Sequence, residues 1–341
     1  MIDKLIETGI VPDPLLRLGI RKLLQERLKS EKKENKERQK EHFVTLVNFL
    51  KESKIAINTA DANKQHYEVP TEFYKLVLGE HLKYSSCYWA DDTETLSEAE
   101  ENMLNITCQR AGIKDGEEIL DLGCGWGSLS FYIAMNYPNC KVTSLSNSAT
   151  QKEYIENKKV ALKVDNIDVI TSDVNHFKSD KKFDRIVSIE MFEHMRNYKQ
   201  LFNKLHKLLV TDGKLFVHIF THNKFAYLFE VKDQTDWMSQ YFFTGGIMPS
   251  DDLLLYFATD FEILNHWVVN GKHYEKTANQ WLKNFDQNKL RIKEIFTQTY
   301  GEQESEKWFN YWRVFFMSCA ELWGYNQGNE WLISHYLFEK R

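Results

Sequence analysis

The chain has 341 residues, of which 43% are hydrophobic and 14% aromatic, enough for a packed core in one large or two ordinary domains. Its formal net charge of -5 excludes a global basic field that would recruit nucleic acid. The five cysteines have neither Cys-x-x-Cys nor metal-ligand spacing, so we expect no metal site and a reducing compartment.

The N-terminal part of the chain is predicted to be helical. Leucine and isoleucine recur at helical spacing over residues 15–28, interleaved with Arg and Lys. This pattern fits a basic helix on an anionic membrane, or a helix that packs its apolar side on the protein, which we favour. A mixed-charge run over 30–41 follows. Charges stand where a signal peptide needs an apolar segment, and no run approaches a transmembrane length, so we expect a cytoplasmic protein.

Two polar and aromatic stretches precede the central motif. His66-Tyr67-Glu68 lies just ahead of a helix that Pro70 can open. Residues 83–89 read KYSSCYW. The residues alone fit ligand-facing loops and ordinary structure equally well. Residues 96–111 then predict a helix that leads into the core sheet.

The central motif spans residues 118–143. A short apolar run ends in Gly-Cys-Gly-Trp-Gly at 123–127, and a helical pattern and a second strand follow, which predicts the first βαβ unit of a doubly wound sheet. Its glycine order lacks the dinucleotide spacing, and no Lys-Ser/Thr pair follows for a triphosphate. The motif resembles instead the first motif of S-adenosylmethionine (SAM)-dependent methyltransferases. Asp121 there suits an ammonium group, and Gly123 and Gly125 permit close approach of a ligand.

Polar residues also follow the next two strands. No acidic residue closes the second strand to hold a ribose, and Asn147 and Gln151 can supply hydrogen bonds in its place. The third strand, over 167–170, is followed by Ser-Asp-Val at 172–174. By analogy with the motif, Asp173 can accept from an adenine amino group while Val174 packs on the ring.

The fourth strand, predicted over residues 183–190, ends in an acidic and histidine-containing segment. Ligands of open α/β sheets bind beyond the carboxyl ends of strands, where Glu190, Glu193 and His194 fall. If the segment is helical, these positions share one face. Two carboxylates and an imidazole could hold an ammonium and move a proton. The alternative is a charged helix start with a solvent-facing histidine, and the position beside the predicted SAM site favours function.

The C-terminal half predicts strands at 215–220 and 261–269, with an aromatic, glycine-containing loop at 236–250 between them. His218 lies in the first of these strands. Residues 277–338 predict aromatic-rich helices, whose rings are mostly core, although some could face an apolar or cationic ligand.

Taken together, these motifs resemble the cyclopropane fatty acid synthase superfamily of methyltransferases, and within it most of all the coclaurine and pavine N-methyltransferases. The resemblance runs nearly end to end, through HYEVPTEFYKLVLG, KYSSCYW, LDLGCGWGSL, SIEMFEHM and YFFTGGIMPS. It implies an α/β fold with a Rossmann-like class I SAM-dependent methyltransferase sheet and helices on both faces. We expect a helical extension over 1–60 and the methyltransferase domain over 61–341, with a substrate-covering helical cap from about 225–260 and 275–341.

The resemblance also implies the residues of the two binding sites. The SAM pocket is expected to use Tyr84, Ser85, Asp121, Gly123, Gly125, Asn147, Gln151, Asp173, Val174 and Ile189. Catalysis is assigned to His194, Glu193, Glu190 and Glu68. The substrate is expected to contact Glu68, Glu190, His218, Tyr274 and, from the aromatic loop, Phe243.

One departure from the superfamily pattern helps to choose the reaction. The lipid enzymes resemble one another in a Tyr-Ser-Cys run whose cysteine helps to hold a bicarbonate base. Here Tyr84-Ser85 is followed by Ser86, and the cysteine comes one place later, at Cys87. A damaged bicarbonate site argues against carbocation chemistry on an alkene and favours methyl transfer to an amine.

The predicted function is therefore SAM-dependent N-methylation of a small secondary or tertiary amine of the tetrahydroisoquinoline type. His194 is the candidate base, with Glu193 orienting it or receiving the charge, while Glu68 and Glu190 attract the cation. A lipid-modifying synthase and a non-catalytic SAM-binding module are the alternatives. The expected partner is the amine, without nucleic acid. Peripheral membrane contact is not favoured, and a homodimer is an open alternative to a monomer.

Overall fold

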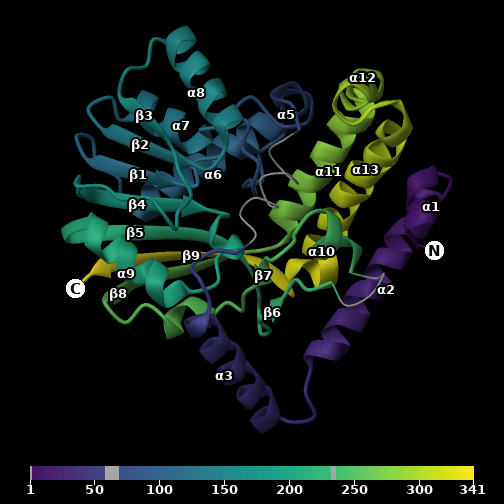
Figure 1. The fold of residues 1–341 in the computed structure, drawn as a ribbon, viewed down its shortest axis with the longest axis horizontal. Helices are drawn as coiled ribbons and strands as arrows, with labels where there is room; N and C mark the ends of the chain where they lie inside the picture. The colour runs from purple at the N-terminus through teal and green to yellow at the C-terminus, as the bar shows by residue number, and fades with distance from the viewer. Residues whose placement is uncertain (1, 58–68, 232–235) are drawn as a thin grey trace.

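The computed structural model describes residues 2–57, 69–231 and 236–341. A seven-stranded sheet in the order β3-β2-β1-β4-β5-β9-β8 forms its centre (Figure 1). The first five strands in this order are parallel, and β9 is antiparallel to both of its neighbours. The predicted α/β class is confirmed. The strands are β1 (Glu118–Leu122), β2 (Lys141–Ser146), β3 (Ile167–Thr171), β4 (Phe183–Ile189), β5 (Leu209–His222), β8 (Phe261–Val269) and β9 (Trp331–Lys340).

Helices cover both faces of this sheet because its strands are apolar on both sides. In β1, Ile119 packs in the cluster that contains α7, while Leu120 and Leu122 pack in the cluster that contains α9. Successive side chains of a strand point to opposite faces, so two cores form from one strand. The helices beside the sheet are α6 (Leu96–Ala111), α7 (Ser128–Asn136), α8 (Ala149–Leu162) and α9 (Tyr198–Leu208).

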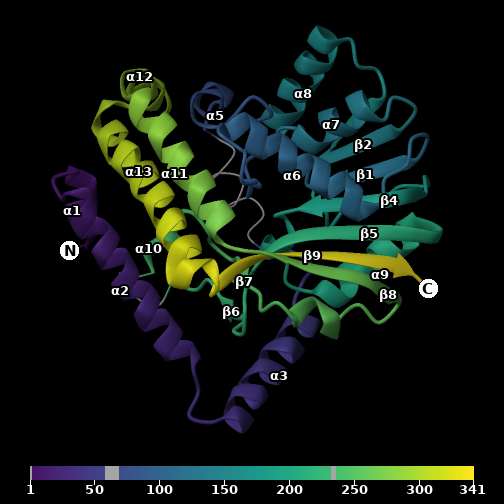
Figure 2. The same cartoon turned by 180° about the vertical axis from the view of Figure 1, so that it is seen from behind.

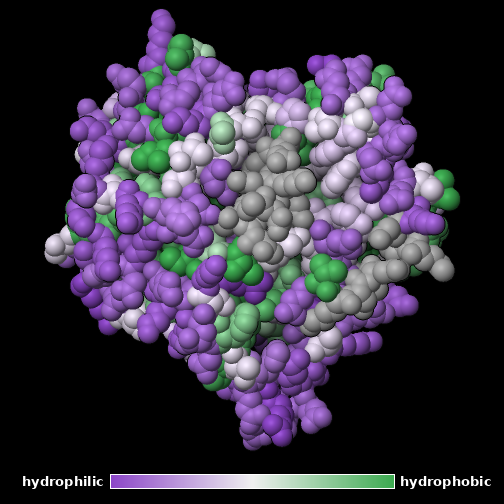
Figure 3. Space-filling model, viewed as in Figure 1, coloured by the Kyte–Doolittle hydropathy of each residue, from purple (hydrophilic) through white to green (hydrophobic). Residues whose placement is uncertain are grey.

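The N-terminal helices lie against the C-terminal ones. Figures 1 and 2 show α2 running alongside α13 (Glu302–Gly324). The half-buried Leu16, Ile20, Leu24 and Leu28 of α2 pack on the largely aromatic core cluster there. The packed alternative for residues 15–28 is therefore confirmed. The tip between α2 and α3 is largely hydrophilic in Figure 3. The helices in this contact are α1 (Ile2–Thr8), α2 (Asp13–Glu31) and α5 (Thr71–Val77), whereas α3 (Lys36–Glu52) packs in the core cluster that contains α9.

The C-terminal region departs from its prediction. Helix was expected over 277–338 and helical cap over 275–341, but residues 331–340 form strand β9, which lies between β5 and β8. A short apolar run such as WLISHYLF shows no period that separates a buried strand from a buried helix. The preceding helices do form, as α11 (Lys272–Gln287), α12 (Lys289–Tyr300) and α13 (Glu302–Gly324).

Short elements complete the described fold between β4 and the C-terminal strand. A two-stranded sheet of β6 and β7 lies in the region predicted as the first part of the cap. In the described ranges, no helix combines the length and apolarity that crossing a bilayer requires. The short elements are η1 (Phe192–His194), β6 (Tyr227–Leu228), α10 (Trp237–Tyr241), β7 (Ile247–Met248), η2 (Leu253–Tyr256) and η3 (Tyr325–Gly328).

Candidate active site

A solvent-open cavity of about 800 Å³ lies at the carboxyl ends of the first four parallel strands. This is the edge at which open α/β sheets bind ligands, because the loops after neighbouring strands converge there. Each of those strands contributes, and the loop after α10 closes one side. The described lining includes Gly123, Gly125, Ser146, Asn147, Gln151, Ser172, Asp173, Val174, Glu190, Met191, His194, Met195, Thr244 and Gly245.

The glycine turn after β1 brings bare backbone to the cavity wall. Gly123 has φ +84° and Gly125 has φ +54°, both in the region that L side chains avoid. The backbone N–H groups of Gly123 and Cys124 both donate to the Leu145 carbonyl at 2.9 Å, which fixes the turn on β2. A Cβ atom on Gly123 would lie 2.7 Å from Cγ of Met191, so any larger residue would collide with the loop after β4.

Polar groups after β2 and β3 fit a nucleoside. Gln151 Oε1 accepts from Ser146 Oγ at 2.6 Å, and its buried Nε2 has no hydrogen-bond partner in the described structure. That amide can donate to a ribose hydroxyl oxygen. Asp173 Oδ1 accepts from the Asn175 backbone and side chain at 2.7 and 2.8 Å, which fixes a carboxylate at the cavity. The residues present therefore fit SAM.

The predicted SAM residues divide into two groups. Those on the cavity wall are Gly123, Gly125, Asn147, Gln151, Asp173 and Val174. Those not found among the described lining residues are Tyr84, Ser85, Asp121 and Ile189.

Asp121 lies beneath the glycine turn instead of on the cavity wall. Its Oδ2 accepts from Ser130 Oγ at 2.6 Å, and the residue is 2% exposed. Burial raises the pKa of this carboxyl to about 6. Asp121 therefore connects β1 to α7 in this structure.

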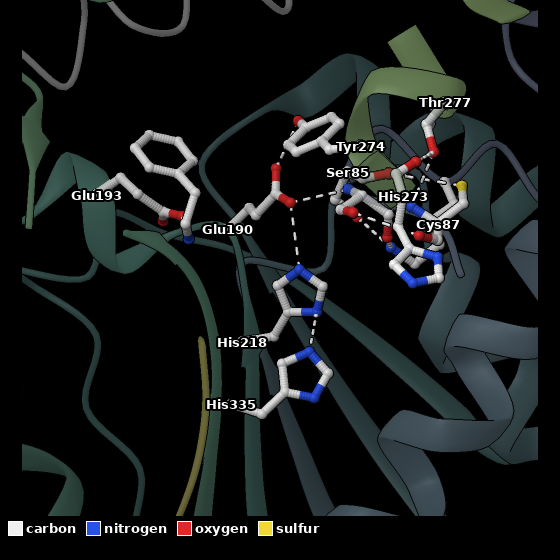
Figure 4. Close-up of polar contacts among 12 residues, drawn as sticks. Ser85, Cys87, Glu190, Glu193, His218, His273, Tyr274, Thr277 and His335 are labelled. Carbon is white, nitrogen blue, oxygen red and sulfur yellow. Dashed lines mark hydrogen bonds and ion pairs between the residues drawn. The ribbon is translucent and has the colours of Figure 1, made fainter. Parts of the chain in front are cut away.

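Glu190 is held at the cavity by polar contacts from three other segments. Oε1 accepts from the Ser86 backbone N–H at 2.8 Å and contacts His218 Nε2 at 3.2 Å, while Oε2 accepts from the Tyr274 hydroxyl at 2.8 Å (Figure 4). Glu190 has φ +45°, a conformation that costs roughly 1–2 kcal/mol for a residue other than glycine. Strain of this kind persists where surrounding contacts fix it, as these three polar contacts do.

The electrostatics of Glu190 reflect its burial. Burial raises the pKa of this carboxyl, whereas the Lys83 ammonium and the hydrogen bonds from Ser86 and Tyr274 act to lower it. Lys83 is itself buried, with Nζ donating to Ser85 Oγ at 2.6 Å. Burial is the largest of these effects, so the pKa of Glu190 lies above its usual range although Lys83, Ser86 and Tyr274 oppose the rise.

The helical face expected to join Glu190, Glu193 and His194 does not form. Only Phe192–His194 is helical, as a 3₁₀ turn, and Glu190 precedes it with its left-handed backbone. A 3₁₀ turn has three residues per turn, so α-helical spacing does not apply. Glu193 points inward and its Oε1 accepts from the Phe220 N–H at 2.8 Å, whereas His194 lines the cavity.

The two neighbours in this turn have different surroundings. Glu193 is 0% exposed and its Oε2 has no hydrogen-bond partner in the described part of the chain. Burial raises the pKa of Glu193 well above its usual range, and the nearby Glu190 adds to the effect. His194 stacks on Phe243, with ring centroids 5.3 Å apart and planes at 9°.

Aromatic rings surround the acidic side of the site. Tyr274 stacks on Trp323 of α13, with centroids 4.8 Å apart. Phe243 contacts Phe220 at 5.7 Å between centroids, next to the cavity residues Thr244 and Gly245. The predicted substrate residues His218, Tyr274 and Phe243 thus lie within one connected region, and Glu68 lies outside the described residues.

Sequence reasoning missed several lining residues. Ser146 and Ser172 adjoin predicted positions, so their location at strand ends was the available signal. Met191 and Met195 lie in the predicted acidic segment, but as apolar residues they carried no chemical signal. Thr244 belongs to the aromatic loop that the sequence marks, without a local feature that singles it out.

The displaced cysteine is also buried. Cys87 Sγ lies 3.7 Å from the Ser85 carbonyl, and burial raises the pKa of its thiol. Ser86, which precedes this cysteine, gives its backbone N–H to Glu190 and its hydroxyl to the Cys87 carbonyl.

A family model described as mycolic acid cyclopropane synthetase matches residues 55–330. (S)-Coclaurine N-methyltransferase of Thalictrum flavum subsp. glaucum is 42% identical over 99% of this chain and 95% of its own length. The chain belongs to the cyclopropane synthase family. Cyclopropane-fatty-acyl-phospholipid synthase of Escherichia coli (strain K12) is a more distant member, 28% identical over 69% of this chain and 61% of its own length.

Comparison with solved structures narrows the assignment within this family. The crystal structure of coclaurine N-methyltransferase bound to N-methylheliamine and SAH matches it with a TM-score of 0.96 and 41% identity, over 99% of both chains. The cyclopropane synthase CmaA1 complexed with SAH and CTAB, at 23% identity and a TM-score of 0.69, shares the fold. The chain is thus a SAM-dependent N-methyltransferase, and SAM is its methyl donor.

Proposed function

We propose that the protein methylates the nitrogen of a small secondary or tertiary amine of the tetrahydroisoquinoline type. The observation that carries this proposal is the shared cavity: the glycine turn, Glu190 and His194 lie on its wall. A nucleoside-binding edge, an anchored carboxylate and an imidazole therefore meet in one space. The similarity to coclaurine N-methyltransferase supports the class of acceptor.

Glu190 is proposed to attract the cationic amine. Its carboxylate is fixed by donors from Ser86, His218 and Tyr274, so it needs little reorganisation when positive charge develops on nitrogen. A nearby carboxylate also raises the pKa of an ammonium, which opposes deprotonation. The bound amine must therefore lose its proton to a separate base.

His194 is proposed as that base. It lines the cavity, and its stacking on Phe243 holds the plane of the ring. SAM supplies a methyl group that is already activated on a sulfonium, so the protein chiefly aligns the reactants. His194 takes the ammonium proton, the freed nitrogen pair forms the new C–N bond, and the C–S bond breaks with its electrons left on sulfur.

Glu193 is proposed to position His194 rather than to meet the substrate. Its hydrogen bond to the Phe220 N–H holds the 3₁₀ turn on β5, and its pKa is raised by burial, so it carries a proton where a base would need to be ionised. Glu68 keeps its proposed role at the amine. Helices α11 to α13 and the loop after α10 are proposed to cover the substrate.

The deciding assay compares two panels of acceptors for SAM-dependent methylation by the purified protein. One holds secondary and tertiary tetrahydroisoquinolines and simple arylalkylamines, and the other holds unsaturated phospholipid vesicles. We expect methylated amine, S-adenosylhomocysteine (SAH) and no lipid product. Lipid that gains one CH₂ while the amines stay inert would overturn the proposal in favour of the lipid alternative.

Two substitutions test the roles. His194→Ala should lower kcat on the order of a hundredfold or more, the usual value of a general base. Glu190→Gln should weaken the interaction with cationic amine while SAH binding persists. The exposed His176, outside the cavity, provides the matched control as His176→Ala. A near-control rate for His194→Ala at saturating amine would remove it from the role of base.

A further inference from the structure

Behind Glu190, two buried histidines and an arginine form a continuous chain. His218 Nε2 lies 3.2 Å from Glu190 Oε1, and its Nδ1 lies 3.0 Å from His335 Nε2 (Figure 4). His335 Nδ1 in turn lies 2.8 Å from Arg110 Nη1. Both histidines are 0% exposed, and they face each other directly in the β5–β9 pairing. Arg110 lies over the Trp267 ring, 5.1 Å from its centroid.

The arginine fixes the direction of every hydrogen bond in this chain. A guanidinium has only donors and does not lose its proton, so His335 Nδ1 must accept. In a neutral imidazole the other nitrogen then carries the hydrogen, so His335 Nε2 donates to His218 Nδ1. By the same rule His218 Nε2 carries a hydrogen and donates to Glu190.

Both histidines are neutral in this environment. Burial lowers the pKa of His218 and of His335 well below the ordinary range, and the charges of Lys83 and Arg110 act in the same direction. Without a terminal donor, the hydrogen bonds of the neutral histidine pair could all reverse their donor-to-acceptor direction. His218 would then present a lone pair to Glu190, which repels a carboxylate and favours a protonated carboxyl.

We propose that Arg110 and His335 are positioning residues that fix the tautomer of His218, so that an N–H always faces Glu190. The proposal rests on the proposed function, in which ionised Glu190 holds the cationic amine. The chain is not a route for the substrate proton, because Arg110 at its far end cannot accept one. Its effect reaches the reaction through Glu190 alone.

Other groups also act on the carboxyl of Glu190 and must stay unchanged in a test. Those facing it from the surrounding elements, besides His218, are Lys83, Cys87, Glu193, His194, Tyr274 and Cys319. His335 is also near Lys83 and His266. Arg110 contacts the chain only at its far end, so it is the substitution that disturbs these groups least.

The first test reads the tautomers directly. ¹⁵N NMR of imidazole nitrogens in the SAH-bound protein distinguishes protonated from unprotonated positions, with assignments from His218→Asn and His335→Asn. We expect Nδ1 unprotonated and Nε2 protonated for both histidines. Arg110→Met, which covers Trp267 without a donor, should yield a mixture, and Arg110→Lys should restore the single tautomer. Unaltered tautomers in folded Arg110→Met would overturn the proposal.

The second test measures how the affinity for a cation at Glu190 depends on pH. The permanent cation N,N-dimethyltetrahydroisoquinolinium is titrated calorimetrically into the SAH complex across pH, so that the ligand itself does not titrate. Arg110→Met removes the assured N–H from the ionised form of Glu190, which raises the pKa of that carboxyl and requires a higher pH for tight binding. Near neutral pH we expect affinity to fall on the order of tenfold, the value of one charge-assisted hydrogen bond. Arg110→Lys should recover most of it.

The outcomes separate this inference from the function on which it rests. Altered tautomers with an unchanged pH profile of cation binding would refute the connection between the chain and Glu190. Glu190→Gln that binds the cation and turns over amines like the wild type would remove Glu190 as the anchor, whatever the tautomers show. If the proposed function and this inference both hold, Glu190→Gln loses cation binding and Arg110→Met shifts the pH profile of cation binding.

Discussion

Relative to the wild type, the Glu193→Gln variant should become increasingly stable as the pH rises. Glu193 is fully buried with one oxygen on the Phe220 N–H and the other without a partner in the described structure. A glutamine keeps the oxygen that accepts from the Phe220 N–H. Its amide nitrogen takes the place of Oε2, the oxygen that would carry the carboxyl proton. The burial that raises the pKa of Glu193 means that the folded protein keeps a proton which the unfolded chain releases.

The sign and size follow from proton linkage. Below the carboxyl pKa of the unfolded chain both states hold the proton, and wild type and variant have similar stability. Above it, unfolding releases a proton, so wild-type stability falls by about 1.4 kcal/mol per pH unit until the folded pKa is reached. An unfolding entropy of about 2.1 cal/mol/K per residue is about 0.7 kcal/mol/K for 341 residues. The melting temperature of the variant should therefore gain about 2 °C per pH unit over the wild type.

The assay is calorimetric or fluorimetric melting of the wild type and variant across pH, with Glu100→Gln as the control. Glu100 is also buried, and burial raises its pKa to about 7, but both of its oxygens accept backbone N–H groups. A glutamine there must point its side-chain N–H₂ group at a backbone N–H, so that both donors are left without an acceptor, at a cost of about 1–3 kcal/mol. A Glu193→Gln difference that is negative, or flat with pH, would refute the reasoning.

The glycine turn and the tyrosine at Glu190 give two further tests. Gly123→Ala should destabilise the protein by about 2–5 kcal/mol, from positive φ and the contact with Met191, and Gly125→Ala by only about 1–2 kcal/mol. Equal effects in chemical denaturation would contradict the contact. Tyr274→Phe removes a hydrogen-bond donor from ionised Glu190, so the pKa of Glu190 rises. We expect kcat/KM to fall on the order of tenfold near neutral pH. The deficit should shrink at higher pH; a constant deficit would point to lost packing instead.

The parts of the fold that sequence could predict are those with local causes. The strand, glycine turn and helix over residues 118–136 follow from period and composition, and so do α6 and β8, whose bounds match the prediction. The cavity location follows from topology alone, since the carboxyl ends of parallel strands meet at one edge. Gln151 and Asp173, which were assigned by analogy with the SAM motif, both line the cavity at that edge.

The parts that could not be predicted depend on distant pairing. Nothing local shows that Trp331–Lys340 inserts between β5 and β8, because the run is apolar at both parities. That insertion brings His335 opposite His218, which lies 117 residues earlier in the chain. The orientation of Glu193 was likewise hidden, because the choice between an α and a 3₁₀ turn depends on how the segment packs on β5.

The hydrogen bonds around Glu190 also give a physical reason for the separate anchor and base of the proposed mechanism. A proton on Oε1 would face the Ser86 N–H and the His218 N–H, two donors that cannot accept it. Only Oε2 could take a proton, and only if the Tyr274 hydroxyl turned from donor to acceptor. Burial favours the neutral carboxyl, but a bound ammonium supplies the compensating charge. In the proposed mechanism, Glu190 therefore stays ionised when the amine binds, and the proton leaves toward His194, which also lines the cavity.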